Sequence, residues 1–303
     1  PLYWQDPDFG IQRPGVPVVM ITWWEANAYC KWLQVHWDEC QEAQQNSQYK
    51  PEILRLPLEA EWEEAAGGGK PEGRFAWDQP GEVTTDPEEI RRRANIDNEI
   101  WNWQSSQDGC TTPVNRYPLG VSPLGVWDLN GNVEEWQANF RDPGGLPRAV
   151  RGGGWMSDRN FIRDWHDPEF FADATGFRVV CVPRSSAQTP ALEKEVSPQQ
   201  PVQMNKTPVS TIAAEHLVVS KPQQPSKTPD DPEKVLPADL YTFVFLPQHK
   251  GWIGKFPVTN LQYQRFLDAE DFRERRFWVD FPKYGPPPGY KLQGTWGEDG
   301  WQW

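Results

Sequence analysis

A stretch without a single aromatic residue separates two aromatic-rich blocks in this chain. Residues 184–236 are dominated by Pro, Gln, Ser, Thr and Lys and contain no Phe, Tyr or Trp. Such a composition cannot bury enough apolar surface to offset the conformational entropy lost on ordering, so the segment is predicted to be a disordered linker. Any core must therefore be built from residues 1–183 and 237–303.

Tryptophan is unusually frequent in these two blocks. The chain contains 18 Trp, although only 37% of its residues are hydrophobic. A Trp side chain buries a large area without long regular elements, and the 31 Pro and 24 Gly indicate many turns and few long helices. We expect a loop-rich fold around an aromatic core.

The charge and the apolar pattern exclude several classes of partner. A formal net charge of −13 argues against nucleic acid, because phosphate binding needs clustered Lys and Arg. No apolar run reaches membrane length and no signal peptide is visible. The chain opens on Pro1, so we expect a processed form or a slice of a longer protein. The compartment stays open, with the cytoplasm slightly favoured for a soluble chain.

Four cysteines lack the spacing of a zinc site or of a CxxC pair, namely Cys30, Cys40, Cys110 and Cys181. Because free cysteines are often buried, we expect these four to be buried free thiols.

Periodicity and capping residues predict three helices and three strands. Helices are expected over 23–37, where Thr22 and Glu25 form a capping box, over 58–66, and over 259–267 with Thr259 or Asn260 as the cap. Strands are expected over 149–151, 176–182 and 241–246.

Six stretches of the sequence together resemble one known family. They are Pro17-Val18-Val19 with WWEANAYCKWL, RLPLEAEWE at 55–63, GVWDLNGNVEEW at 125–136, RGGGW at 151–155, GFRVV at 176–180 and PVTNLQY at 257–263. They resemble motifs of the formylglycine-generating-enzyme, or sulfatase-modifying-factor, family. The resemblance implies an α+β fold of the C-type-lectin-like kind, loop-rich, with short antiparallel strands and two main helices.

The order of these motifs differs from that of the family, where the PVTN motif comes early and GFRVV comes late. Residues 1–183 correspond to the C-terminal part of such a domain and residues 237–303 to an N-terminal part. The chain is therefore either a circular permutant or a slice through tandem domains. Either block alone would expose a large apolar face, so we expect Tyr263, Phe266 and Leu267 to pack against residues 23–33.

The metal ligands that the family's oxidase chemistry requires are absent from this sequence. The resemblance implies a Cys pair in the loop after RGGGW, which binds copper, but Ser157 stands at the first position and no Cys follows before Cys181. A hydroxyl does not hold Cu(I) as a thiolate pair does. The iron-dependent relatives use a histidine-rich site, whereas His36, His166, His216 and His249 are scattered. Copper and iron are both disfavoured.

The resemblance implies two structural calcium sites. The first set is Asp128, Gly131, Val133 and Glu135, and the second is Asn95, Ile96, Asp108 and Cys110. Side-chain and carbonyl oxygens converging from turns are the donors that Ca²⁺ prefers. The alternative is that Asp128 and Glu135 only cap turns by accepting backbone hydrogen bonds.

The loop 156–171 is the expected ligand-binding face, because the resemblance places a variable recognition surface there. The candidate ligand-binding residues are Trp155, Ser157, Asp158, Asn160, Phe161, Asp164, Trp165 and His166. The alternative is that Trp165 and Phe170 belong to the core.

The function predicted from these features is a non-catalytic, calcium-stabilised binding module that recognises a protein or a small molecule. A metal-dependent oxidase of the same family is the competing hypothesis. A third is a regulatory domain of a larger multidomain protein, whose enzymatic part lies outside this chain.

Overall fold

The computed structural model describes most of both aromatic-rich blocks. The described residues are 4–39, 51–68, 75–96, 110–141, 146–156, 163–182 and 240–278, with the backbone of 295–297 and 300–302. The predicted linker 184–236 lies outside these residues.

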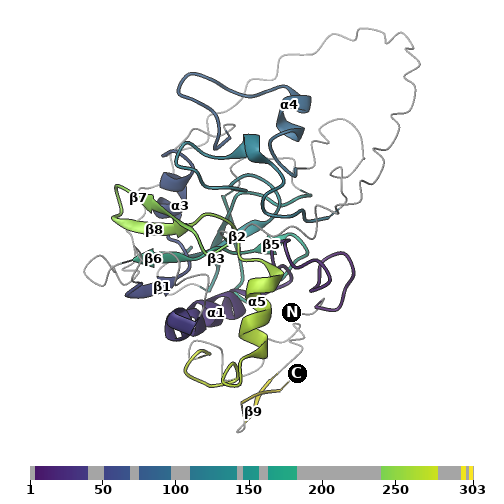
Figure 1. Cartoon of the computed structure of the whole chain (residues 1–303), viewed down its shortest axis with the longest axis vertical. Helices are drawn as coiled ribbons and strands as arrows, with labels where there is room; N and C mark the ends of the chain where they lie inside the picture. The colour runs from purple at the N-terminus through teal and green to yellow at the C-terminus, as the bar shows by residue number, and fades with distance from the viewer. Residues whose placement is uncertain are drawn as a thin grey trace.

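One four-stranded sheet joins the two blocks of the sequence (Figure 1). Its strands follow the order β1 (Ile53–Arg55), β6 (Val180–Val182), β8 (Gly251–Gly254) and β7 (Phe243–Leu246). All neighbours are antiparallel. Strand β6 of the first block pairs directly with β8 of the second, with Val180 opposite Ile253. The second block thus supplies half of this sheet.

A second four-stranded sheet is built from the first block alone. Its order is β4 (Arg163–His166), β3 (Arg148–Arg151), β2 (Glu134–Phe140) and β5 (Thr175–Gly176). The β2–β5 pair is parallel and the other pairs are antiparallel. This sheet carries four of the candidate site residues, Glu135 on β2 and Asp164, Trp165 and His166 on β4.

Helices are few and short, as expected for a loop-rich α+β fold. They are α1 (Trp23–His36), α3 (Glu59–Ala65), α4 (Pro87–Arg91) and α5 (Asn260–Asp268), with 3₁₀ turns at Trp37–Glu39 and Pro118–Gly120 and a hairpin of β9 (Thr295–Gly297) and β10 (Gly300–Gln302). Among the described helices, none has the length and apolar character needed to cross a membrane.

Capping boxes begin the two main helices. The Thr22 N–H donates to Glu25 Oε2 at 2.7 Å, and the Glu25 N–H donates back to Thr22 Oγ1 at 3.2 Å. Thr259 and Gln262 repeat the arrangement at the start of α5, where the Thr259 N–H donates to Gln262 Oε1 at 2.9 Å. Both boxes satisfy amide groups that a helix leaves unpaired at its first turn. The predicted starts of both helices are confirmed, and Thr259 rather than Asn260 is the cap.

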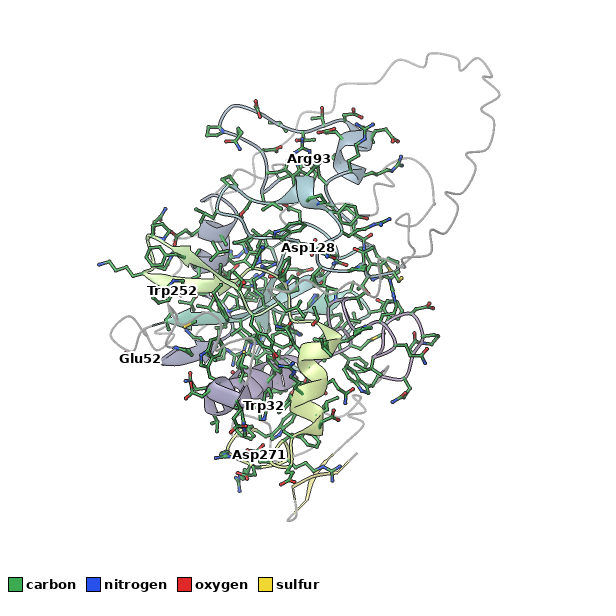
Figure 2. All side chains as sticks on the ribbon, viewed as in Figure 1. Trp32, Glu52, Arg93, Asp128, Trp252 and Asp271 are labelled. Carbon is green, nitrogen blue, oxygen red and sulfur yellow. The ribbon has the colours of Figure 1, made fainter. Side chains whose placement is uncertain are left out.

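The rings of α5 pack on α1 in one aromatic core, and Figure 2 marks Trp32 of α1, which belongs to this core. Tyr263 stacks on Tyr29 with ring centroids 5.5 Å apart. Phe266 meets Tyr29 edge-on at 6.0 Å and Trp32 at 5.6 Å, and Leu267 packs against the same cluster. The predicted contact between α5 and residues 23–33 is confirmed.

Two elements differ from the prediction. The expected strand 176–182 is divided into β5 and β6, because residues 177–179 pair in neither strand; Arg178, in this interval, is fully buried. The segment 156–171, predicted as a loop, contains strand β4, which pairs along its whole length with β3. The sequence of β4, Arg-Asp-Trp-His, gave no strand signal, because each face of the strand carries one charged and one aromatic residue and neither face is apolar.

A histidine connects the end of α1 to the turn after α5. The His36 ring lies 2.7 Å from Glu39 through Nδ1 and 2.9 Å from Asp271 through Nε2. Burial opposes the charged ring, but the hydrogen bonds to both carboxylates prevail and raise the pKa of His36. A neutral ring carries one N–H and donates to only one of the two carboxylates.

Phe266→Ala should lower the free energy of unfolding by about 3–5 kcal/mol, because it empties a fully buried site in the core shared by both blocks. Phe245→Ala is the matched control, since this side chain is 47% exposed, and its cost should stay within about 1 kcal/mol. Urea unfolding measures both. Equal effects of the two substitutions would contradict a shared core.

His36→Gln should destabilise the protein more under acidic than under alkaline conditions. Because the folded-state pKa is raised above 6.5, the stabilisation is fully present below that pH and is lost as the pH rises through the folded value. Unfolding free energies of wild type and variant at about pH 5.5 and about pH 8.5 test this. A pH-independent difference would show that the ring acts by packing on Trp32 alone.

Candidate functional site

The turn before β2 has a backbone that its sequence explains. Asp128, Gly131 and Asn132 have φ values of 53°, 77° and 65°. Asp, Asn and Gly adopt this left-handed conformation more readily than other residues. Gly131 also lies so close to Asn95 that a Cβ would stand 2.4 Å from the Asn95 carbonyl oxygen. The turn therefore packs directly against the segment that carries the second predicted metal set.

Asp128 is a buried carboxyl in this turn. Burial raises its pKa to about 8, with a further rise from Glu135 and opposing contributions from the Arg178 guanidinium and the Asn132 side chain. Its Oδ2 has no hydrogen-bond partner among the described residues. A buried carboxylate oxygen without a donor is costly unless it is protonated or meets a cation.

Glu135 is fully buried and paired with Arg178. Arg178 Nη2 lies 2.5 Å from Glu135 Oε1 and Nε lies 2.6 Å from Oε2, which also accepts from Trp62 Nε1 at 2.8 Å. The guanidinium further donates to the carbonyls of Trp127 at 2.8 Å and Gly254 at 2.9 Å. Glu135 thus forms an ion pair with Arg178, a contact that neither the predicted calcium role nor the alternative of a turn cap included.

The second predicted set is described only in part, since Asp108 lies outside the described residues. Asn95 is buried, and its Nδ2 donates to the Cys110 carbonyl at 2.9 Å. Its Oδ1 has no hydrogen-bond partner among the described residues. Ile96 is buried beside it. An amide oxygen and nearby carbonyls are hard donors of the kind calcium takes.

Carboxylates alone do not form a metal cluster in the described part of the chain, where no group of three or more His, Cys, Asp and Glu side chains converges. The two predicted sets would rely instead on carbonyl and amide oxygens together with one or two carboxylates. In the first predicted set, the Gly131 carbonyl accepts from the Val133 N–H at 2.9 Å.

The candidate recognition residues fall into three groups. Trp155 is buried, and its Nε1 donates to the Asp173 carbonyl at 3.0 Å, so it anchors the segment. Asp164, Trp165 and His166 lie on β4. The other four, Ser157, Asp158, Asn160 and Phe161, lie outside the described residues.

The side chains of β4 differ in their surroundings. Asp164 is exposed, and its Oδ1 accepts from the Trp165 N–H at 2.7 Å. Trp165 is half-buried under the Arg163 guanidinium, 4.7 Å from the ring centroid. His166 stacks on Phe170 at 4.1 Å, and its Nε2 lies 3.2 Å from Glu134. Trp165 therefore remains accessible, whereas Phe170 packs against the core.

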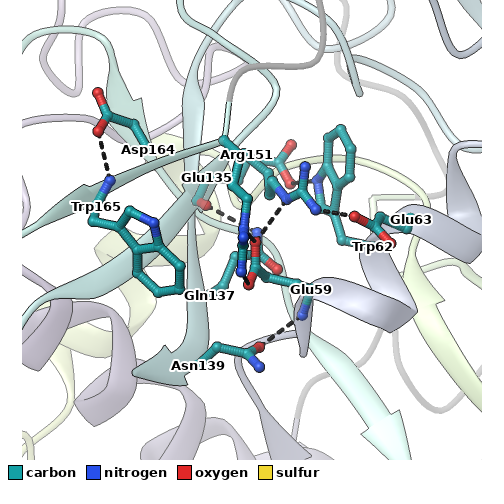
Figure 3. Close-up of polar contacts among 10 residues, drawn as sticks. Glu59, Trp62, Glu63, Glu135, Gln137, Asn139, Arg151, Asp164 and Trp165 are labelled. Carbon is teal, nitrogen blue, oxygen red and sulfur yellow. Dashed lines mark hydrogen bonds and ion pairs between the residues drawn. The ribbon is translucent and has the colours of Figure 1, made fainter. Parts of the chain in front are cut away.

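A network of ion pairs, which the sequence analysis did not predict, connects β3 and β4 to α3. Figure 3 shows Arg151 between Glu59 and Glu63 of α3, and Arg151 Nε lies 2.9 Å from Glu59. The Glu59 carboxylate also accepts two hydrogen bonds from Arg163, from Nε to Oε1 at 2.8 Å and from Nη2 to Oε2 at 2.9 Å. The spacing of Glu59 and Glu63, one helical turn apart, was the available signal, because such residues share a helix face.

The described cysteines, Cys30, Cys110 and Cys181, are free and buried. Burial raises the pKa of Cys30 far above its usual range and that of Cys181 to about 12. Both thiols stay protonated in the core, which disfavours soft-metal binding. Cys40 lies outside the described residues.

Comparisons with known proteins place the chain among relatives of varied activity. It is 29% identical over 220 residues to a formylglycine-generating enzyme of Thermomonospora curvata, covering 60% of this chain and 62% of the relative. It is 29% identical over 197 residues to the inactive C-alpha-formylglycine-generating enzyme 2 of Mus musculus, covering 58% and 54%. It is 32% identical over 183 residues to the serine/threonine-protein kinase Pkn1 of Chlamydia trachomatis, covering 54% and 24%.

The chain spans less than two thirds of the length of each of these relatives. A family model described as the sulfatase-modifying factor enzyme 1-like domain matches residues 5–182, which is more than half of the chain. With the resemblance of the motifs and the α+β architecture, this match shows that the chain belongs to the sulfatase-modifying factor enzyme 1-like domain family.

Proposed function

We propose that the chain is a non-catalytic, calcium-stabilised binding module on a formylglycine-generating-enzyme-like scaffold. Two observations together carry the proposal. Asp128 Oδ2 and Asn95 Oδ1 are buried and have no hydrogen-bond partner among the described residues. In addition, Ser157 stands where the family has its first copper-binding cysteine. The first feature favours a hard cation, and the second disfavours the soft one.

Charge around the first position supports a cation there. Asp128 and Glu135 are two buried carboxyls, while Arg178 is the guanidinium that offsets them. When both carboxyls are ionised, one negative charge stays uncompensated in a buried setting, which is strongly unfavourable. Among the described residues, Glu135 Oε1 accepts a hydrogen bond from Arg178 Nη2 and keeps further acceptor capacity. Asp128, Glu135 and the carbonyls of Gly131 and Val133 would hold calcium, which would link the turn to β2.

The second position is supported by Asn95. Its unpartnered Oδ1, the Ile96 and Cys110 carbonyls and the Asp108 carboxylate would hold calcium there. Calcium at this position would fix the segment 110–114 to the turn. Its role would be structural, since Cys110 would contribute its backbone carbonyl rather than its thiol, and the remaining donors are carboxylate, amide and carbonyl oxygens.

The proposed recognition surface is centred on β4 and the segment before it. Met156 is 52% exposed, Asp164 is exposed, and Trp165 is half-buried beneath Arg163. Aromatic and Arg side chains on a well-supported strand are typical of binding surfaces. The ligand is a protein or a small molecule that fits a mixed aromatic and charged face.

The relatives support both this proposal and its competitor. One relative is named an inactive C-alpha-formylglycine-generating enzyme 2 and another a formylglycine-generating enzyme, at the same identity of 29%. A copper-dependent oxidase would need thiolates, and the described cysteines are buried free thiols. The kinase relative, of which the match covers 24%, favours a place in a larger multidomain protein.

Calcium should stabilise chelator-treated protein, and Asp128→Ala should remove most of that gain. A ligand present at about 100 times its dissociation constant raises the unfolding free energy by about 2.7 kcal/mol. Thermal unfolding with and without roughly 1 mM calcium measures the difference, a concentration that suits weak structural sites.

Asp167→Ala is the matched control, because this residue is exposed and outside both predicted sets. It should keep the full calcium-dependent shift. No shift in the wild-type protein, or an equal loss in both variants, would sink the calcium proposal.

A further inference from the structure

Residues 240–278, the docking segment, bind the first block by adding strands to its sheet. Strand β8 lies beside β6, with Ile253 opposite Val180. In the order β1-β6-β8-β7, β6 would be an edge strand without this segment. The approach is close, because a Cβ at Gly251 would stand 2.8 Å from Val182 Cγ1. This contact is a strand addition, in which main-chain groups join two parts of the sequence.

Asn260 fixes the start of α5 to a loop near the beginning of the first block. Its Nδ2 lies within hydrogen-bond distance of three main-chain carbonyls, those of Phe9 at 2.9 Å, Gly10 at 2.8 Å and Arg13 at 3.1 Å. Its N–H also donates to the Val16 carbonyl at 3.0 Å. Asn260 is fully buried, so water does not compete for these contacts. One side chain thus recognises the shape of a whole loop.

The turn between β7 and β8 is held by a buried carboxylate of the first block. Glu64 of α3 accepts from the Gln248 N–H at 2.7 Å and from the His249 N–H at 3.2 Å, and His249 Nδ1 lies 2.6 Å from Glu64 Oε2. The rings of α5 add the apolar contact with α1. Strand, polar and apolar contacts are therefore spread over the docking segment.

These contacts hold the two parts together without help from the sequence that links them. They lie wholly within 1–183 and 240–278. The linking residues 184–236 contain no aromatic residue, and such a composition is not expected to bury much apolar surface. A first block without the docking segment would expose the β6 edge and the aromatic face of α1.

We propose that the docking segment is a separable partner of the first block, which stays bound when the link is cut and which a second copy of this chain can supply. The same contacts form whichever copy supplies the segment, as in domain swapping. In the intact chain, the link raises the effective concentration of its own segment to roughly millimolar or less, which favours the closed monomer at micromolar concentration. Cutting the link removes this advantage. The inference is independent of the calcium proposal, since the docking segment contains no residue of either calcium set.

A protease site inserted within residues 184–236 of the full chain tests the first part, because cleavage removes the link and leaves both parts whole. After cleavage is complete on a denaturing gel, native mass spectrometry at micromolar concentration should find both parts in one complex. Urea unfolding should become concentration-dependent, since the cut protein unfolds into two molecules. Parts that separate at micromolar concentration, or a cut protein that loses its circular dichroism spectrum, would overturn the inference.

Exchange between copies is measured with two preparations of the cut protein, one of them labelled throughout with nitrogen-15. The two are mixed at a urea concentration just below the unfolding midpoint and then returned to buffer. Native mass spectrometry should find labelled first blocks bound to unlabelled docking segments, and the reverse. If only the parental complexes remain, the segment is not separable and the inference is wrong.

Asn260→Ala in the cut protein should raise the dissociation constant of the two parts by roughly five-fold or more, because the three loop carbonyls lose their buried donor. Gln264→Ala on the same helix is the matched control. Its Nε2 donates to Asp268 of α5 itself, so the constant should change by no more than about two-fold. Circular dichroism of both variants before cleavage separates loss of docking from loss of folding. Equal constants in the two variants would contradict this account of the interface.

Discussion

The buried ion pair between Glu135 and Arg178 holds together segments that lie far apart in the sequence. Arg178 donates to Glu135 on β2, to the Trp127 carbonyl in the preceding turn and to the Gly254 carbonyl at the end of β8. It therefore connects the two sheets and both sequence blocks at one point. Removing one partner of such a pair leaves an unpaired buried charge and typically costs about 3–5 kcal/mol.

The same pair sets the electrostatics of the candidate cation site. One guanidinium faces two carboxyls, so Asp128 is left to be protonated or to bind a cation. The turn that carries Asp128 reaches Asn95 through Gly131 and reaches the recognition segment through Asn132 and Trp155. Under the proposed function, this turn would connect the cation position to the segment that binds the ligand.

Local signals in the sequence predicted a good part of this fold. The capping boxes at Thr22 and Thr259 gave the starts of α1 and α5, because caps are short-range interactions. Their mutual packing followed from apolar faces that neither block could bury alone. Strand β4 was missed since its residues are charged or half-buried, so its pairing with β3 is decided by tertiary contacts.

The polar contacts of the site were harder to predict. Asp128 and Glu135 were both named as oxygen donors, but the Glu135 partner, Arg178, is 43 residues away and has no local signature. Glu59 and Arg163 are 104 residues apart. Pairings of this kind depend on the finished fold, and sequence spacing cannot reveal them.

Metal analysis of the purified, full chain is the most direct test of the central claim, that this family scaffold holds calcium in place of oxidase chemistry. Elemental analysis under reducing conditions, after dialysis against calcium and copper, would compare the two ions in one sample. The account predicts calcium in stoichiometric amount without copper or iron. Tightly retained copper with no calcium would contradict it.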